Sequence, residues 1–176
     1  MAADLSALGR SGAAVHDELT ATDALVSDML QASYDSMRMV FPGTGVELLV
    51  RGADIAGIRV RTDVTRLCEV LDNLLSNSLA HTPAGGRVYL GARVHDTEVE
   101  FVIQDEGRGI SPDDLPHVLE PFYRGEGGSG GRTPRPGMGL GLAISSRLVE
   151  AMGGRLALSS EGLGCGTTAS VFLPRV

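Results

Sequence analysis

Two asparagines in "DVTRLCEVLDNLLSNSLAH" (63–81) have a type and spacing suited to chemistry. At 100° per residue, Asn73 and Asn77 lie one helical turn apart at the edge of an apolar stripe. The stripe consists of Leu67, Val70, Leu71, Leu74 and Leu75. Two such amides can ligate a hard cation through their oxygens or orient a water. Taken alone, the pair favours the simpler interpretation of polar residues bordering a core helix.

A carboxylate followed by glycines ends a predicted strand in "QDEGRGI" (104–110). The carboxylate of Asp105 can accept a hydrogen bond from the exocyclic amine of a base. Gly107 and Gly109 then let the backbone approach a planar ligand closely. An ordinary Asp-Gly turn is the alternative, and these residues by themselves leave both interpretations open.

The stretch "GMGLGLAI" (137–144) carries glycines at alternate positions and leads into a predicted helix. It is not a Walker A loop, because no Lys-Ser/Thr pair follows, and it is not a Rossmann fingerprint, because a loop precedes it rather than a strand. Free N–H groups and the helix dipole favour an anion at such a position. The stretch indicates a phosphate site slightly more than a hinge.

Two further segments contain polar groups next to glycines. In "EPFYRGEGGSGGRTPRP" (120–136), Phe122 and Tyr123 form an aromatic anchor, and Arg124 stands beside a loop that could close over phosphates. A solvated linker is the alternative. In "GLGCGTT" (162–168), Thr167 offers a hydroxyl at the start of the last strand, although an ordinary Gly-rich turn explains the segment alone.

The elements that must position these residues follow from periodicity and from Gly, Pro and capping signals. Helices are predicted at 22–40, 63–81 and 139–152, with a short helix at 111–120. Strands are predicted at 46–52 and 58–61 as a hairpin, at 87–94 and 98–105 as an antiparallel pair, and at 155–160 and 167–174. Residues 125–137 are predicted to form a flexible loop. A mixed, mostly antiparallel sheet with about three helices is an α+β fold.

Composition limits the function classes. The chain has 176 residues, 43% of them hydrophobic, which suits one domain with a real core. It has no apolar run long enough to span a membrane and no signal-peptide pattern at its start. Cys68 and Cys165 lack metal-ligand spacing and suit a reduced, cytoplasmic setting. The formal charge of −7 argues against a nucleic-acid surface.

The order of the five segments carries more information than any one of them. An Asn-bearing helix, D-x-G-x-G, E-P-F-Y-R, G-x-G-L-G-L and a final G-x-G-T together resemble the catalytic and ATP-binding domain of bacterial sensor histidine kinases, in the GHKL ATPase superfamily. The resemblance covers about residues 44–176. It implies a two-layer α/β sandwich, the Bergerat fold, with ATP between the helical layer and a flexible lid at about 111–137. We expect the domain to span 21–176, with 1–20 as a tail or linker remnant.

The resemblance assigns a role to each candidate residue. Asn77 corresponds to the Mg²⁺-binding residue, and Asn73 to a catalytic carboxylate or its polar substitute. Asp105 corresponds to the acceptor of the adenine amine. The other nucleotide-binding residues are then Gly107, Gly109 and Ile110 beside the base, His81 at an aromatic position, Thr167 assisting Asp105, Tyr123 and Arg124 beside the F-box residue Phe122, and Gly137, Gly139, Leu140 and Gly141 near the phosphates.

The chain departs from the family pattern in three places. The family usually carries Lys or Arg just before His81, where this chain has Ala80, and often Ala after Asn77, where it has Ser78. The usual helical hairpin with an acceptor histidine is not visible. His16 in "VHDELTA" (15–21) faintly echoes its core, but lies too close to Asn73 to leave room for a full hairpin.

The resemblance therefore implies a module that binds Mg·ATP and transfers the γ-phosphoryl to a histidine on a separate dimerisation domain, and through it to a response regulator. We expect a cytoplasmic monomer that contacts neither membrane nor nucleic acid. One alternative is an anti-sigma-factor type serine kinase on the same fold, although "EPFYR" and the long lid favour the histidine kinase branch. The other is a non-catalytic ATP-binding regulator, for which Ala80 is the best support.

Overall fold

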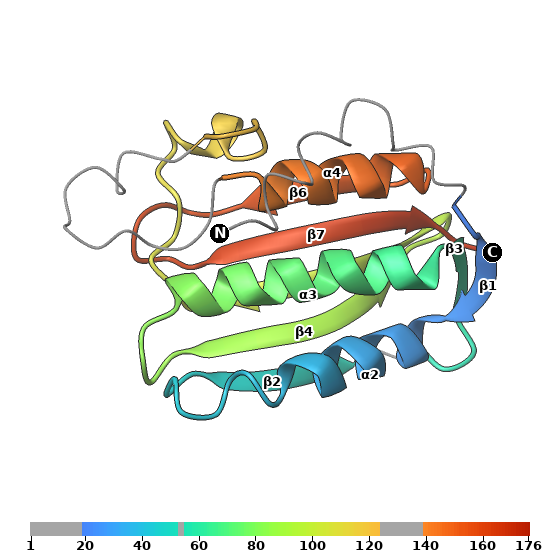
Figure 1. Ribbon diagram of the computed structural model, residues 1–176, viewed down its shortest axis with the longest axis horizontal. Helices are drawn as coiled ribbons and strands as arrows, with labels where there is room; N and C mark the ends of the chain where they lie inside the picture. The colour runs from blue at the N-terminus through green and yellow to red at the C-terminus, as the bar shows by residue number, and fades with distance from the viewer. Residues whose placement is uncertain (1–18, 53–54, 124–138) are drawn as a thin grey trace, which may run out of the picture.

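A five-stranded sheet with helices on one face forms the body of the protein (Figure 1). The computed structural model describes residues 19–52, 55–123 and 139–176. The strands follow the order β2-β4-β5-β7-β6, and all neighbours are antiparallel except β2 and β4, which are parallel. Their bounds are β2 Glu47–Gly52, β4 Arg87–Val94, β5 Glu98–Asp105, β6 Arg155–Ser159 and β7 Thr167–Pro174.

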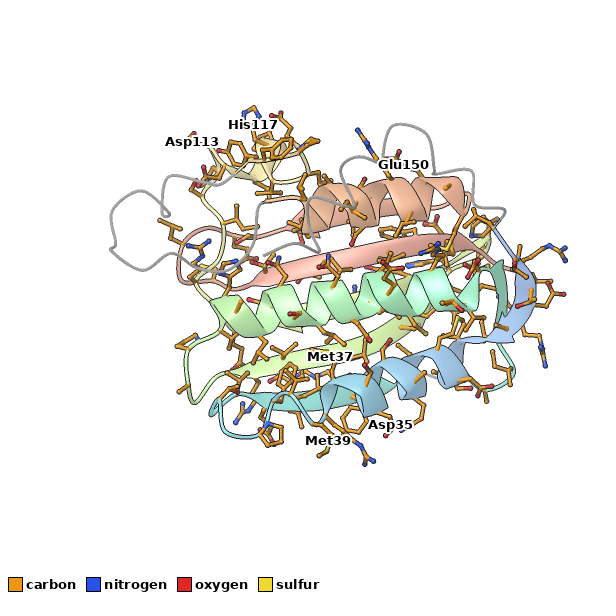
Figure 2. All side chains as sticks on the ribbon, viewed as in Figure 1. Asp35, Met37, Met39, Asp113, His117 and Glu150 are labelled. Carbon is orange, nitrogen blue, oxygen red and sulfur yellow. The ribbon has the colours of Figure 1, made fainter. Side chains whose placement is uncertain are left out.

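Three α-helices lie side by side on the sheet, with α3 in the middle (Figure 1). They are α2 Val26–Met37, α3 Val64–His81 and α4 Gly141–Ala151. The outer helices carry charged residues on their solvent sides, among them Asp35 of α2 and Glu150 of α4 (Figure 2). The result is the expected two-layer α+β sandwich.

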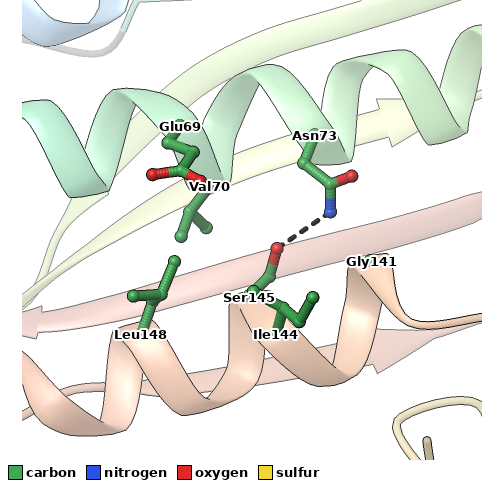
Figure 3. A pocket seen from close by; sticks show the side chains of 7 residues that line it. All are labelled: Glu69, Val70, Asn73, Gly141, Ile144, Ser145 and Leu148. Carbon is green, nitrogen blue, oxygen red and sulfur yellow. Dashed lines mark hydrogen bonds between the residues drawn. The ribbon is translucent and has the colours of Figure 1, made fainter. Parts of the chain in front are cut away.

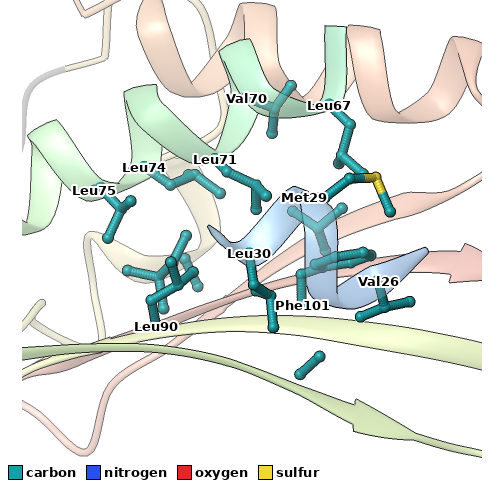
Figure 4. Packing of buried hydrophobic residues seen from close by; sticks show 14 of the residues in the cluster. Val26, Met29, Leu30, Leu67, Val70, Leu71, Leu74, Leu75, Leu90 and Phe101 are labelled. Atoms are coloured by element: carbon teal, nitrogen blue, oxygen red, sulfur yellow. The ribbon is translucent and has the colours of Figure 1, made fainter. Parts of the chain in front are cut away.

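The core lies between α3 and the inner face of the sheet (Figure 4). The whole apolar stripe predicted for this helix is buried, with Leu67, Val70, Leu71 and Leu75 fully so. Phe101 and Leu90 face it from the sheet, and Met29 of α2 closes one side. Burial of these large side chains, each contributing about 1.5–3 kcal/mol, fixes the rotation of α3 about its axis. That rotation leaves Asn73 and Asn77 at the edge of the core.

Local signals set the ends of α3 as predicted. Asp63 is the N-cap, and its carboxylate accepts a hydrogen bond from the backbone N–H of Arg66 at 3.0 Å. The helix ends at His81, two residues before Pro83. The pairing of β4 with β5, and the presence of β6 and β7, are also confirmed.

Two predictions for the first third of the chain were wrong. The helix expected at 22–40 begins only at Val26, because Thr22–Leu25 form strand β1, which pairs with β3 (Arg59–Thr62) in a separate two-stranded sheet. The hairpin of 46–52 with 58–61 does not form. Strand β2 pairs with β4 instead, because the edge of the main sheet offers its backbone a longer partner.

The first part of the predicted lid, residues 111–120, also differs from expectation. A helix was predicted at 111–120, but only a 3-10 turn, η1 (Leu115–His117), is present. Pro116 removes a backbone donor inside the turn, and the hydroxyl of Ser111 bonds both the carboxylate and the N–H of Asp114. The predicted flexible loop at 125–137 lies outside the described residues.

The C-terminus closes against the small sheet. The N–H of Val176 donates to the carbonyl of Arg59 at 3.2 Å, and the N–H of Arg175 donates to the carbonyl of Thr97 at 3.0 Å. An isolated bridge joins Val60 to Arg175. Strands β1 and β3 and the end of the chain therefore share one corner of the molecule (Figure 1).

Candidate nucleotide site

Asp105 ends β5 on the inner face of the sheet, with only 6% of its surface exposed. Its Oδ1 accepts two backbone hydrogen bonds, from Gly107 at 2.9 Å and from Thr167 at 3.1 Å. Thr167 is also the residue directly opposite Asp105 in the β5–β7 ladder. The two residues predicted to hold the base are therefore neighbours, although they are far apart in the sequence. Both backbone bonds use Oδ1, so neither of these N–H groups occupies the second oxygen.

Burial raises the pKa of Asp105, since removal from water disfavours the charged form. Hydrogen bonding from Gly107, from the hydroxyl of Ser78 on α3 and from Thr167 opposes this effect without cancelling it. No cationic side chain among the described residues contributes. A buried acceptor without a cation of its own suits a neutral donor such as the amine of a base.

Glycines 107 and 109 are required by close contacts. A Cβ at Gly107 would lie 2.6 Å from both the Asp105 Oδ1 and the carbonyl oxygen of His81. Gly109 has a positive φ of 69°, and its Cβ would collide with the carbonyl of Gly162. The loop after Asp105 is therefore wedged between the end of α3 and the turn before β7.

That turn, 162–166, supports the loop with a series of hydrogen bonds. Gly166 donates its N–H to the carbonyl of Gly107, and Gly164 donates to that of Arg108. The hydroxyl of Ser160 receives the N–H of Ile110 at 3.0 Å and donates to the carbonyl of Gly166 at 2.7 Å. The glycine-rich turn that looked ordinary in the sequence thus fixes the position of Ile110, the residue expected to pack on the base.

The second half of the site lies between α3 and α4. The side-chain Nδ2 of Asn73 donates to the Oγ of Ser145 at 2.9 Å (Figure 3). A Cβ on Gly141, the first residue of α4, would lie 2.9 Å from the Oδ1 of Asn73. Glycine at this position therefore lets the start of α4 lie against the asparagine amide.

Asn77 is half-buried one turn further along α3. Among the described residues its amide has no hydrogen-bond partner, so within this part of the chain it is open to a ligand. Ala80 is exposed on the same helix, and His81 is half-buried with its carbonyl bonded to the N–H of Arg108. The second half of α3 thus contacts the start of α4 at Asn73 and the loop after Asp105 at His81.

The residues on either side of segment 124–138 are joined by a hydrogen bond. The N–H of Phe122 donates to the carbonyl of Gly139 at 3.0 Å, and Gly139 has a positive φ of 71°. Tyr123 donates its hydroxyl to Asp114 at 2.6 Å, and its ring centroid lies 5.4 Å from that of His117. Leu140 is the N-cap of α4, and its carbonyl accepts the N–H of Ile144. The predicted site residues Arg124 and Gly137 lie outside the described residues.

The described residues can hold the two ends of a nucleotide. Asp105, Thr167 and the 107–110 loop lie together as a candidate base-binding end, and the N-terminus of the 11-residue helix α4 is a candidate anion-binding end. Among the described residues, no cluster of three or more His, Cys, Asp or Glu side chains could hold a metal ion. A magnesium ion fits such a site only as a partner of phosphate oxygens, with an amide such as that of Asn77 as protein ligand.

Three hydroxyls in this arrangement were not predicted as site residues. The hydroxyl of Ser78 lowers the pKa of Asp105, Ser145 accepts a hydrogen bond from Asn73, and Ser160 accepts the N–H of Ile110. Only Ser78 carried a sequence signal, as a departure from the usual alanine. A serine within a helix or at a strand end has no spacing pattern of its own, so the other two could be found only from the fold.

Residues 62–176 match the family described as "Histidine kinase-, DNA gyrase B-, and HSP90-like ATPase". The chain belongs to this family. The ATPase fold inferred from the motifs is therefore confirmed, and ATP binding with it. None of the helices in the described part of the chain is both long and apolar enough to cross a membrane.

The sequence of this ATPase domain is similar to parts of two bacterial signalling proteins. It is 40% identical to the "Virulence sensor protein BvgS" of Bordetella bronchiseptica, over 85% of this chain and 12% of that protein. It is 37% identical to the "Histidine protein kinase DivJ" of Caulobacter vibrioides, over 84% of this chain and 24% of that protein. The chain thus spans less than a quarter of the length of these curated relatives.

A solved structure gives the same result for the fold. The full-length ShkA protein in complex with AMPPNP aligns with a TM-score of 0.82 and 29% identity, over 98% of this chain and 35% of that one. The resemblance to sensor histidine kinases is confirmed at the level of the ATP-binding domain. The roles of the individual site residues stay predictions.

Proposed function

We propose that this domain uses Mg·ATP to phosphorylate a histidine on a separate dimerisation domain, from which the phosphoryl group passes to a response regulator. The buried carboxylate of Asp105 carries this proposal. It lies at the end of β5 beside Thr167, with one oxygen held by the backbone and the other available to an adenine amine. The relative DivJ is named a histidine protein kinase, which supports this activity over others on the fold.

At the base-binding end, the protein selects and orients the nucleotide. The free oxygen of Asp105 accepts the exocyclic amine of adenine, and Thr167 assists from the opposite strand. Gly107 leaves the carboxylate of Asp105 uncovered, since a Cβ there would lie 2.6 Å from its Oδ1. Ile110 packs against the face of the base. A base that carries a carbonyl in place of the amine would set two acceptors against each other, so adenine is preferred.

At the phosphate end, the protein positions charge. The first N–H groups of α4 bind phosphate oxygens, while the amide oxygen of Asn77 binds Mg²⁺. The metal ion, when bound, neutralises charge on the β- and γ-phosphates. Asn73 then meets the acceptor histidine as a hydrogen-bonding group. Phosphoryl transfer needs positioning and charge stabilisation more than covalent help from the protein, and these groups suit that need.

Ala80 makes the phosphate end less cationic than the family pattern. An exposed alanine takes the place of a lysine or arginine that would face the phosphates. We expect weaker ATP affinity or slower transfer as a result. Arg124 is the candidate to compensate, from the lid region.

One experiment decides between the proposed function and its two alternatives. The domain is mixed with a histidine-bearing dimerisation domain and with ATP labelled on the γ-phosphate. Label that reaches the histidine, and is lost on Asn77→Ala, supports the proposal. Transfer that survives Asn77→Ala contradicts the metal-binding role. Tight ATP binding without any transfer favours the non-catalytic regulator, for which Ala80 is the specific observation, and label on a serine of a sigma-factor regulator favours the serine kinase.

Three further properties belong to this proposal. The domain comprises residues 21–176, with 1–20 as a tail or linker remnant. In isolation it is a monomer, which sedimentation would test. Since its substrate is ATP and its partner a response regulator, it works in the cytoplasm.

A further inference from the structure

The hydrogen bond between Asn73 and Ser145 joins the two helices that meet at the phosphate end. Nδ2 of Asn73 and Oγ of Ser145 are 2.9 Å apart, and Figure 3 shows the two side chains pointing toward one another from α3 and α4. Ser145 is almost fully buried, with 2% of its surface exposed. Asn73 is only half-buried, so one side of its amide is fixed inside the protein while the other side meets solvent.

The amide also lies directly against the start of α4. A Cβ at Gly141 would come within 2.9 Å of Oδ1 and 3.2 Å of Nδ2 of Asn73. The amide therefore occupies the space beside the first turn of α4, whose free N–H groups bind phosphate oxygens in the proposed function. The distance from this amide to the transferred phosphoryl group therefore depends on which rotamer the Asn73 side chain adopts.

A groove of about 250 Å³ lies next to this amide, between the two helices. Val70, Asn73 and Ser145 line it together with Gly141, Ile144 and Leu148, and Glu69 lies at its far end (Figure 3). The groove gives the Asn73 side chain room to swing away from the start of α4. Without a partner, a half-buried asparagine would sample several rotamers in this space.

We propose that Ser145 is a positioning residue for phosphoryl transfer, because its hydroxyl holds the Asn73 amide at the start of α4 in one orientation. This inference rests on the proposed function. The hydroxyl uses one N–H of the amide and leaves the second N–H and the Oδ1 to face the reacting groups. Ser145 itself touches neither nucleotide nor acceptor and acts only through Asn73.

The expected size of the effect follows from one hydrogen bond between uncharged groups. Such a bond contributes about 1 kcal/mol net, which corresponds to about a fivefold change in rate when it is needed only to orient a reacting group. Loss of Asn73 itself should be more harmful, since it removes the group that Ser145 orients. ATP binding should change little, because the base-binding end is formed by other residues.

The chain offers a matched control one residue away. Ser146 is the next residue of α4, and its hydroxyl bonds Glu150 at 3.1 Å on the exposed side of the helix. Ser146→Ala therefore removes a serine hydroxyl from the same helix without touching Asn73. It should leave transfer, ATP affinity and thermal unfolding as in the wild type.

The test is a double-mutant cycle of Ser145→Ala and Asn73→Ala, with transfer to the histidine-bearing domain as readout. Ser145→Ala should slow transfer about fivefold, with the ATP dissociation constant within about twofold of the wild type. The double variant should be as slow as Asn73→Ala alone, because the serine has nothing left to position. Ser145→Cys, which keeps a weak hydrogen-bonding group of similar size, should fall between serine and alanine.

Several results would overturn the inference. If Ser145→Ala transfers at the wild-type rate, or if the two substitutions add independently, Ser145 does not act through Asn73. If Ser145→Ala and Ser145→Cys weaken ATP binding and thermal stability as much as they slow transfer, the serine is only structural. A wild-type domain that binds ATP but transfers nothing contradicts both the proposed function and this inference, whereas normal transfer by both variants contradicts the inference alone.

Discussion

Two carboxylates on strand β5 have opposite surroundings. Asp105 lies on the inner face at the end of the strand, and Glu100 lies on the outer face near its start, each with 6% of its surface exposed. Burial raises the pKa of Asp105. Burial acts on Glu100 in the same direction, yet hydrogen bonds from Ser170 and His95, together with the charge of Arg93, hold the pKa of Glu100 below its usual value.

The difference lies in the partners rather than in the degree of burial. Glu100 accepts the Ser170 hydroxyl at 2.7 Å and the Nε2 of His95 at 3.1 Å, and pairs with Arg93 at 3.5 Å. Both of its oxygens are therefore used. Asp105 has backbone N–H groups on one oxygen only, the hydroxyl of Ser78, and no cation among the described residues. A saturated carboxylate stabilises the sheet, whereas an incompletely paired one remains able to bind a ligand.

The largest effect is expected from Asp105→Asn. The amide oxygen can keep the bonds from Gly107 and Thr167, which places the new NH₂ group where adenine presents its own amine. Two donors then face each other, and the ATP dissociation constant should rise about 100-fold, or about 2.7 kcal/mol. Calorimetric titration measures this. Glu100→Gln is the matched control and should bind ATP like the wild type; equal loss in both variants would contradict the comparison.

Acid should separate the two carboxylates further. The pKa of Asp105 is raised in the folded protein, so the stability that it contributes is present at low pH and is lost as the pH rises through that pKa. For Glu100, whose pKa is lowered, the contribution is present above its ordinary pKa and is lost as the pH falls through the lowered value.

ATP affinity should follow the protonation state of Asp105. Since adenine needs the ionised carboxylate, affinity should fall by up to about tenfold per pH unit below the pKa of Asp105. Asp105→Asn, which has no carboxyl to ionise at this position, should keep only the pH dependence of the triphosphate itself, whereas Glu100→Gln should run parallel to the wild type. A pH-independent affinity would show that the base does not depend on an ionised Asp105.

Glu100→Gln should lower the free energy of unfolding and leave ATP binding unchanged. The substitution removes the charge that His95 and Arg93 share, and turns an acceptor into a donor beside Ser170. We expect a loss of about 1–2 kcal/mol in the free energy of unfolding at neutral pH, measured by urea denaturation. The loss should shrink in acid, where the wild-type carboxylate becomes protonated. An unchanged midpoint at neutral pH would mean that the cluster contributes nothing net.

The smallest effect is expected at Ser78. Its hydroxyl lowers the pKa of Asp105 against the effect of burial, so Ser78→Ala should raise that pKa further. ATP affinity should fall only about two- to fivefold at neutral pH, and the acid loss should begin at a higher pH. Ser76→Ala, an exposed serine on the same helix, is the control. If both variants show the wild-type pH profile, Ser78 has no part in the site.

Sequence patterns predicted α3 best, because its cap and its apolar stripe are both local. Strands β4, β5 and β7 were predicted with their observed bounds, because glycines and turn residues next to them mark where they begin or end. The pairing of β2 and the strand at Thr22–Leu25 were missed. Which edge a short strand joins depends on neighbours distant in sequence, and propensity does not contain that information.

The candidate site also has residues that the sequence predicted and residues that it did not. The order of the glycine motifs was enough to predict that Asp105 and Thr167 would meet, and the structure brings them together. Motifs alone did not reveal that Asn73 is bonded to α4, because Ser145 has no signature apart from its position in the fold. Residues that bind a ligand leave a pattern in the sequence, while those that hold them in place are recognised from contacts.

The corner where β1, β3 and the last residues meet has a mechanical consequence. Thr22 enters the fold through the β1–β3 ladder, and Val176 is bonded to β3 through Arg59. Tension applied between these two residues would load the small sheet and the end of β7 at Pro174 directly. Asp105 and Thr167 pair at the opposite end of the β5–β7 ladder from Pro174, so the nucleotide end is the part of that ladder farthest from the pulling point.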